Sequence, residues 1–152
     1  LITGGSSGIG KETAKEFIQK GARVVITGRD EIKLHQVADE IGAIPLLFDI
    51  SQLNVINEMA EKAISLLGGK IDVLVNNAGI GVFPKLGEIS IEDLQSVYTT
   101  NVYGLALLTQ EIVKTFKERT PEIRATSFSS PQSLPSIVSC FGKMILTCAC
   151  FR

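Results

Sequence analysis

The chain has 152 residues, 45% of them hydrophobic and 20% charged, and 15 basic against 16 acidic residues give a formal net charge of −1. These values are typical of a single soluble domain, and the balanced charge excludes a strongly basic nucleic-acid-binding protein. No apolar run approaches the ~20 residues that cross a bilayer, so we expect neither nucleic acid nor membrane as a partner. The cysteines (140, 148 and 150) and the single histidine predict reduced thiols in a cytoplasmic protein, with no metal site.

Four short apolar runs predict strands that are buried on both faces of a parallel sheet. They are Leu1–Thr3, Val24–Thr27, Ile44–Phe48 and Val73–Val75. Between them, apolar residues spaced three and four apart predict amphipathic helices, each ended by glycine at 21, 42 or 68–69. The alternation predicts an α/β fold with right-handed crossovers, a Rossmann-like doubly wound parallel sheet.

A longer helix is predicted over residues 101–118, with a wide apolar stripe. We favour burial of this stripe against the sheet, and contact with a second subunit is the alternative.

The composition changes after Arg119. Residues 120–152 contain three of the five prolines, all three cysteines and a single acidic residue, Glu122. We therefore expect an NAD(P)-binding Rossmann-like domain over residues 1–119. Residues 120–152 are expected to be a divergent or truncated tail of the same domain, which leaves the sheet incomplete at its C-terminal side.

A glycine-rich turn follows the first predicted strand, in the sequence Thr3-Gly4-Gly5-Ser6-Ser7-Gly8-Ile9-Gly10. Gly4 lets the chain leave the strand sharply, while Gly8 and Gly10 allow close approach of a pyrophosphate and of helix to strand. The N–H groups and dipole at the start of the next helix favour phosphate. The turn therefore predicts a dinucleotide-binding site.

The same turn also has the spacing of a nucleoside-triphosphate P-loop as far as Lys11. That loop requires Ser or Thr next to hold Mg²⁺, and this chain has Glu12, whose carboxylate would repel triphosphate oxygens. We therefore disfavour nucleotide hydrolysis.

The second strand bears on the choice of dinucleotide. It ends in Gly28-Arg29 and lacks the carboxylate that usually holds the ribose hydroxyls of NAD. Arginine binds phosphate in a bidentate manner, and Asp30 is expected to cap the next helix and point away. NADP is therefore predicted in preference to NAD.

With these residues in view, the chain resembles a classical short-chain dehydrogenase/reductase over residues 1–119. The resemblance rests on the glycine turn, on Asp49-Ile50 after the third strand, on Asn76-Asn77-Ala78-Gly79 after the fourth, and on Asn101. It implies that the cofactor contacts Gly4, Ser6, Ser7, Gly8, Ile9, Gly10, Arg29, Asp49, Ile50, Asn77, Ala78 and Gly79. Taken singly, Asp49 could be a helix cap and the asparagines turn or capping residues.

The resemblance also implies a catalytic set. Asn101 would hold a water for the proton relay, and Ser130, after Phe128-Ser129, is the candidate for the serine that orients a carbonyl. The family also uses Tyr-x-x-x-Lys, in which the lysine lowers the tyrosine pKa. Here the residues four after Tyr98 and Tyr103 are valine and leucine, and Ser139 stands four before Lys143.

We therefore expect an oxidoreductase of this family that transfers hydride between NADP(H) and a small carbonyl or secondary alcohol, and that is catalytically incomplete in this chain. Truncation, or a shifted reading frame after Arg119, would explain both the composition break and the missing tyrosine. The alternatives are a non-catalytic dinucleotide-binding or dimerising module, with a homo-oligomer contact near residues 101–118, and a chain that does not fold because the sheet is uncovered.

Overall fold

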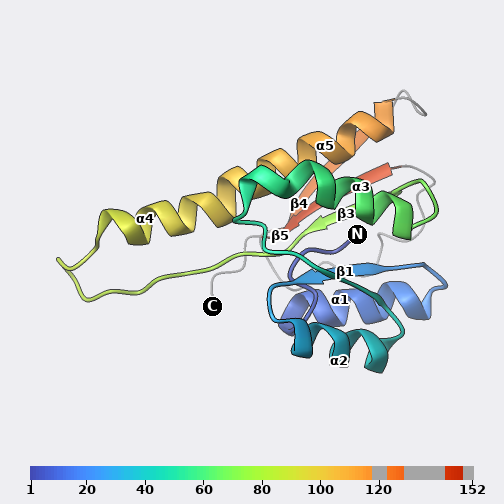
Figure 1. The fold of residues 1–152 in the computed structure, drawn as a ribbon, viewed down its shortest axis with the longest axis horizontal. Coiled ribbons are helices and arrows are strands. Elements are labelled where there is room, and N and C mark those ends of the chain that lie inside the picture. The colour runs from blue at the N-terminus through green and yellow to red at the C-terminus, as the bar shows by residue number, and fades with distance from the viewer. Residues whose placement is uncertain (118–122, 129–142, 149–152) are drawn as a thin grey trace.

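A computed structural model describes residues 1–117, 123–128 and 143–148, which form helices around a parallel sheet (Figure 1). The α-helices are α1 (Gly8–Gln19), α2 (Glu31–Ile41), α3 (Ile56–Leu66), α4 (Ile91–Tyr98) and α5 (Leu105–Lys117). A 3₁₀ turn, η1 (Leu53–Val55), precedes α3, and a π-helical turn, η2 (Thr99–Gly104), joins α4 to α5. The strands are β1 (Val25–Gly28), β2 (Ile44–Leu47), β3 (Val73–Asn76), β4 (Ile123–Phe128) and β5 (Lys143–Cys148).

The first three residues join the two parts of the sheet. Ile2 forms parallel bridges to Ile26 of β1 on one side and to Val75 of β3 on the other. With the pairings β1–β2, β3–β5 and β5–β4, the order across the sheet is β2, β1, residues 1–3, β3, β5, β4, and every pairing is parallel. The predicted α/β class and parallel doubly wound sheet are therefore confirmed.

The two last strands lie in an order that the chain order does not suggest. β5 pairs directly with β3, in the register Asn76 opposite Thr147, and β4 lies outside it at the edge. Since neighbouring strands are about 4.8 Å apart, β4 lies two strand spacings from β3. Two strands from the predicted tail thus belong to the same sheet as residues 1–119.

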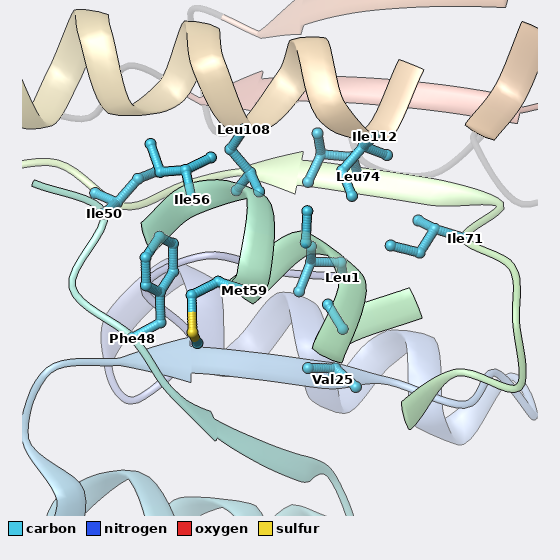
Figure 2. Close-up of a cluster of buried hydrophobic side chains, with 12 residues drawn as sticks. Leu1, Val25, Phe48, Ile50, Ile56, Met59, Ile71, Leu74, Leu108 and Ile112 are labelled. Carbon is cyan, nitrogen blue, oxygen red and sulfur yellow. The ribbon is translucent and has the colours of Figure 1, made fainter. Parts of the chain in front are cut away.

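Hydrophobic clusters cover both faces of the sheet. On one face, α3 and α5 pack over residues of the central strands, including Leu1, Val25 and Leu74, as Figure 2 shows for the labelled side chains. On the other face, α1 and α2 cover Ile2, Ile26 and Val75. Alternate residues of one strand thus enter different clusters, which explains why these runs are hydrophobic without alternation.

The predicted helix ends agree with the structure. α2 begins after Asp30, whose carboxylate accepts a hydrogen bond from the backbone N–H of Lys33 at 3.0 Å, and it ends at Gly42 with a φ of 76°. Gly21, Gly68 and Gly69 also have left-handed φ values, between 83° and 87°. The predicted long helix begins at Leu105, and it continues a helical rod that α4 and η2 start at Ile91.

Candidate functional site

A cleft opens at the carboxyl ends of the central strands, where the chain leaves residues 1–3, β1, β2 and β3. In an open α/β sheet, ligands bind in this position because consecutive helices lie on opposite faces. The cleft brings together every predicted cofactor-binding residue except Gly10: Gly4, Ser6, Ser7, Gly8, Ile9, Arg29, Asp49, Ile50, Asn77, Ala78 and Gly79. Thr27, Gly28, Phe48, Ile80, Gly81 and Thr100 complete its lining.

The glycine turn forms one wall of the cleft and opens α1. Gly4 and Gly8 have φ values of 66° and 53°, in the left-handed region where a Cβ is unfavourable. Ser7, before the first helical residue, makes no side-chain capping bond, and the first turn of α1 has no acidic residue. The N–H groups at this end therefore remain available to an anion, and no carboxylate opposes it.

Thr3 and Asn77 connect the turn to the end of β3. The Thr3 hydroxyl accepts hydrogen bonds from the backbone N–H groups of Asn77 and Ala78, each at 3.0 Å. The Asn77 amide Nδ2 donates back to the carbonyl oxygens of Thr3 and Gly4, also at 3.0 Å. These bonds fix two cleft walls that lie more than 70 residues apart in sequence. Thr3 is part of the glycine motif but is not among the predicted site residues.

Gly10 lies behind the cleft. A Cβ built there would overlap both the Asn77 amide nitrogen and the Gly4 carbonyl oxygen. The glycine is thus required for packing of α1 against the turn and the β3 end.

At the end of β1, Arg29 lies exposed at the rim of the cleft. No ion pair of Arg29 is present within the described part of the chain. The carboxylate of Asp30 is directed to the start of α2, as its capping bond to Lys33 requires. The guanidinium is therefore free to bind an anionic group at this end of the cleft.

Asp49 and Ile50 follow β2. One carboxylate oxygen of Asp49, Oδ1, accepts from the backbone N–H of Ser51 at 3.0 Å and from its hydroxyl at 2.8 Å, which fixes the loop. Ile50 is buried, and its carbonyl oxygen lies so close to Gly104 that a Cβ there would overlap it. The π-helical turn η2 is thereby held against this wall.

Asn101 lies within η2, and its side chain makes two hydrogen bonds to the loop after β3. Its Nδ2 donates to the carbonyl oxygen of Ile80 at 2.8 Å, and its Oδ1 accepts from the N–H of Ile80 at 2.9 Å. Because Ile80 lines the cleft, Asn101 fixes the loop after β3. One N–H of Nδ2 and the Oδ1 of Asn101 are thus engaged by Ile80, and the water-holding role that the resemblance implies for Asn101 stays a prediction.

Asn76 precedes this loop and is buried, 1% exposed. Its Nδ2 donates to the Thr109 hydroxyl on α5 at 2.9 Å, while its Oδ1 has no hydrogen-bond partner among the residues that the structure describes. Asn76 thus fixes α5 to the end of β3.

Lys11, the residue that suggested a P-loop, does not line the cleft. Its ammonium contacts both carboxylate oxygens of Glu40 at 2.7 Å and so joins α1 to the last turn of α2. This geometry argues against a P-loop site.

The proposed proton-transfer residues are not assembled in the described residues. Ser130 and Ser139 lie outside them, as do Cys140 and Cys150. Tyr98 and Tyr103 are half-exposed on the helical rod, with ring centroids 6.5 Å apart, and neither lines the cleft. Residues 1–117, 123–128 and 143–148 contain no group of three metal-ligating side chains and no helix with the length and hydrophobicity needed to cross a membrane.

A family model described as short chain dehydrogenase matches residues 1–127. An uncharacterized oxidoreductase of Bacillus subtilis is 34% identical over 147 residues, which cover 93% of this chain and 38% of the relative. The chain spans less than half the length of the curated relatives that it matches.

Solved structures have the same fold. The 3-ketoacyl-(acyl-carrier-protein) reductase of Brucella melitensis, in complex with NADH, is 37% identical, with a TM-score of 0.75 over 84% of this chain and 55% of that one. The F189W variant of actinorhodin polyketide ketoreductase, with NADPH, is 28% identical, with a TM-score of 0.75 over 84% and 51%. The similar structures therefore include complexes with either nicotinamide dinucleotide.

Proposed function

Since the chain belongs to the short-chain dehydrogenase/reductase family of oxidoreductases, we propose that its cleft binds NADP(H) for hydride transfer to or from a small carbonyl compound or secondary alcohol. The observation that carries the proposal is the convergence of the glycine turn, Arg29, Asp49 and the loop after β3 on one cleft. Bound there, the nicotinamide would supply or accept the hydride, and the chain would provide binding and orientation.

The residues present fit a dinucleotide. The uncapped start of α1 and the left-handed glycines offer backbone N–H groups, without side chains in the way, to a pyrophosphate. Asp49 and Ile50 lie at the wall next to Arg29, where they suit the adenosine half. Asn77, Ala78 and Gly79 form the opposite end, which suits the nicotinamide half.

Arg29 supports the choice of NADP. The strand before it ends in Gly28, which has no carboxylate to hold a ribose 2′-hydroxyl, and a Cβ at this glycine would lie 3.0 Å from the Ser6 hydroxyl. The guanidinium at the rim, which makes no ion pair with any residue that the structure describes, provides the charge and fork geometry that a 2′-phosphate requires.

The test is to compare NADPH and NADH binding to Arg29→Gln by calorimetry. We expect NADPH affinity to fall about tenfold or more, as for loss of a charged hydrogen bond, with NADH affinity unchanged. Arg23→Gln is the matched control, because Arg23 is also exposed but precedes β1, at the end of the strand away from the cleft. Equal losses for both dinucleotides, or no loss, would refute the assignment of Arg29 to the 2′-phosphate.

A second candidate is a dinucleotide-binding module without turnover. It is favoured by the position of the two tyrosines, which lie outside the cleft, and by their lack of a lysine four residues later. We expect the 152-residue polypeptide to bind NADPH without oxidising it in the presence of simple ketones and aldehydes. Carbonyl-dependent loss of NADPH absorbance at ordinary enzyme rates would contradict catalytic incompleteness while leaving the cofactor assignment intact.

We further propose that the protein self-associates through the helix that includes residues 101–118.

A further inference from the structure

One polar residue of the cleft comes from the helical rod rather than from the ends of the strands. Thr100 belongs to the π-helical turn η2 and is 7% exposed. Of the rod residues whose side chains the structure describes, Thr100 alone lines the cleft. Because side chains form the outer surface of a helix, the side chain is the part of Thr100 that reaches the cleft.

The Thr100 hydroxyl has no hydrogen-bond partner among the described residues, whereas the hydroxyls of Thr3, Thr109 and Thr115 each have one. In the same part of the chain, the Oδ1 of Asn76 is the only side-chain polar atom that is both sealed from solvent and unpartnered. The Thr100 hydroxyl is therefore open to the space beside it, which is the cleft. Polar groups of buried residues are ordinarily satisfied, so this hydroxyl is placed to bond to a ligand.

The packing of η2 places Thr100 at the side of the cleft that suits the adenosine half of a dinucleotide. Gly104 follows Thr100 by about one helical turn and so lies on the same face of the rod. This face meets the wall after β2, since a Cβ at Gly104 would overlap the carbonyl oxygen of Ile50. Asn101 is directed to the other wall, where a Cβ at Gly79 would lie 3.4 Å from its Oδ1.

The side chains near this hydroxyl suit a flat ring with a polar edge. Phe48 and Ile50 line the cleft and are otherwise buried in the hydrophobic cluster under α3 and α5. Ligand sites combine apolar walls of this kind with a few polar groups that fix the orientation of the ligand. A threonine hydroxyl both donates and accepts, so it can bond to a ring nitrogen, to the amino group or to a ribose hydroxyl of adenosine.

We propose that the Thr100 hydroxyl hydrogen-bonds the adenosine half of the bound dinucleotide, an inference that rests on the cofactor proposed above. The contact joins the rod directly to the cofactor. From the same turn, Asn101 holds Ile80 with two hydrogen bonds and so positions the loop beside the nicotinamide half. The contact of Thr100 is common to NADPH and NADH, in contrast to that of Arg29.

The test is Thr100→Val, which keeps the shape of the side chain and removes the hydroxyl. Calorimetry should show affinities for NADPH, NADH and adenosine 2′,5′-bisphosphate that all fall by about three- to tenfold, as for loss of one neutral hydrogen bond. Thr100→Ser keeps the hydroxyl and should restore most of the affinity. Thr99→Val is the matched control, because Thr99 is a half-buried residue of the same turn that does not line the cleft.

A purely structural role of the hydroxyl predicts a different result. Since Thr100 makes no bond to the described chain, Thr100→Val should leave the free energy of unfolding without ligand unchanged in urea denaturation. Unchanged affinity of Thr100→Val for adenosine 2′,5′-bisphosphate, or a loss of affinity that Thr100→Ser shares in full, would overturn the proposal. A wild-type chain that binds none of the three compounds would instead refute the cofactor site itself, and the contact with it.

Discussion

At the scale of single residues, the cleft depends on side chains that hold backbone rather than ligand. Four hydrogen bonds cross the strand ends, two between Thr3 and Asn77, one from Asn77 to Gly4 and one from Ala78 to Thr3. Asn101 holds Ile80 with two more. Removing one partner of such a pair leaves a polar group unsatisfied, which costs more than the net value of the bond. Substitution of any of these residues should therefore lower both the stability of the fold and the affinity for the cofactor.

Asn77→Asp isolates this effect, because it keeps the shape and exchanges two N–H donors for acceptors. The new carboxylate would face the carbonyl oxygens of Thr3 and Gly4, which now accept from the amide at 3.0 Å. We expect the free energy of unfolding to fall by about 2–3 kcal/mol at neutral pH, and NADPH affinity to fall with it. Urea denaturation measures the first effect and calorimetry the second.

The loss at Asn77→Asp should shrink under acidic conditions, where a protonated carboxyl can donate to one of the two carbonyl oxygens. Asn54→Asp, at an exposed position of η1, is the control and should be neutral. An unfolding free energy for Asn77→Asp equal to that of the wild type would mean that the two carbonyl bonds do not hold the cleft together.

At the scale of elements, α4 is stabilised at its start by a capping box. The Ser90 hydroxyl accepts from the backbone N–H of Asp93 at 3.0 Å, and the Asp93 carboxylate accepts from the backbone N–H of Ser90 at 3.0 Å. The pKa of Asp93 is lowered first by the backbone N–H of Ser90, which donates to the carboxylate, and second by the Ser90 side chain. The ionised form thus stabilises the helix above the ordinary pKa of aspartate, and this stabilisation is lost as the pH falls through the lowered value.

Ser90→Ala tests the cap. It removes the hydroxyl but keeps the N–H donor of residue 90, so the pKa of Asp93 should rise only part of the way toward its ordinary value. Loss of the cap should cost α4 about 1 kcal/mol and speed amide exchange in its first turn. NMR titration of Asp93 and hydrogen exchange measure the two effects, with Ser96→Ala on the exposed side of the same helix as control. Unchanged amide exchange in the first turn of α4 would show that the hydroxyl has no part in the cap.

The observed helices and strands agree with the predicted ones where the signal is local in the sequence. Apolar spacing and glycine predicted α1, α2 and α3, because their stripes and stops are local properties. α4 was missed although Ser90 and Asp93 have the spacing of a capping box, since its apolar residues are exposed and give no core signal. Local sequence patterns could not predict the strand order either, because the insertion of β5 between β3 and β4 depends on pairings between distant segments. Thr3 belongs to the glycine motif, but local pattern does not predict its role in the cleft, because its bonds to Asn77 and Ala78 join residues 74 and 75 positions apart.

At the scale of the whole molecule, residues 1–3 hold the two parts of the sheet together. Leu1 is buried in the cluster under α3 and α5, and its amino group donates to the carbonyl oxygen of Val73 at 2.9 Å. Burial lowers the pKa of this amine from 8.0 to about 5, and the charge of Asp72 offsets the effect only in part. In a polypeptide whose first residue is Leu1, folding therefore favours the neutral amine.

In a polypeptide that starts at Leu1, this coupling makes the unfolding free energy depend on pH. Because the folded pKa lies below the unfolded one, the unfolded chain binds more protons between about pH 5 and pH 8, and the unfolding free energy rises across this interval. A difference of three pKa units corresponds to at most about 4 kcal/mol.

A chain acetylated at Leu1 cannot be charged there and lacks this contribution, while its amide N–H can still donate to Val73. The stability difference between acetylated and free chains, measured by urea denaturation, should be largest near pH 5 and disappear above pH 8. A difference that stays constant over this range would mean that the amine is charged in the folded sheet, and that the junction between β1 and β3 admits water.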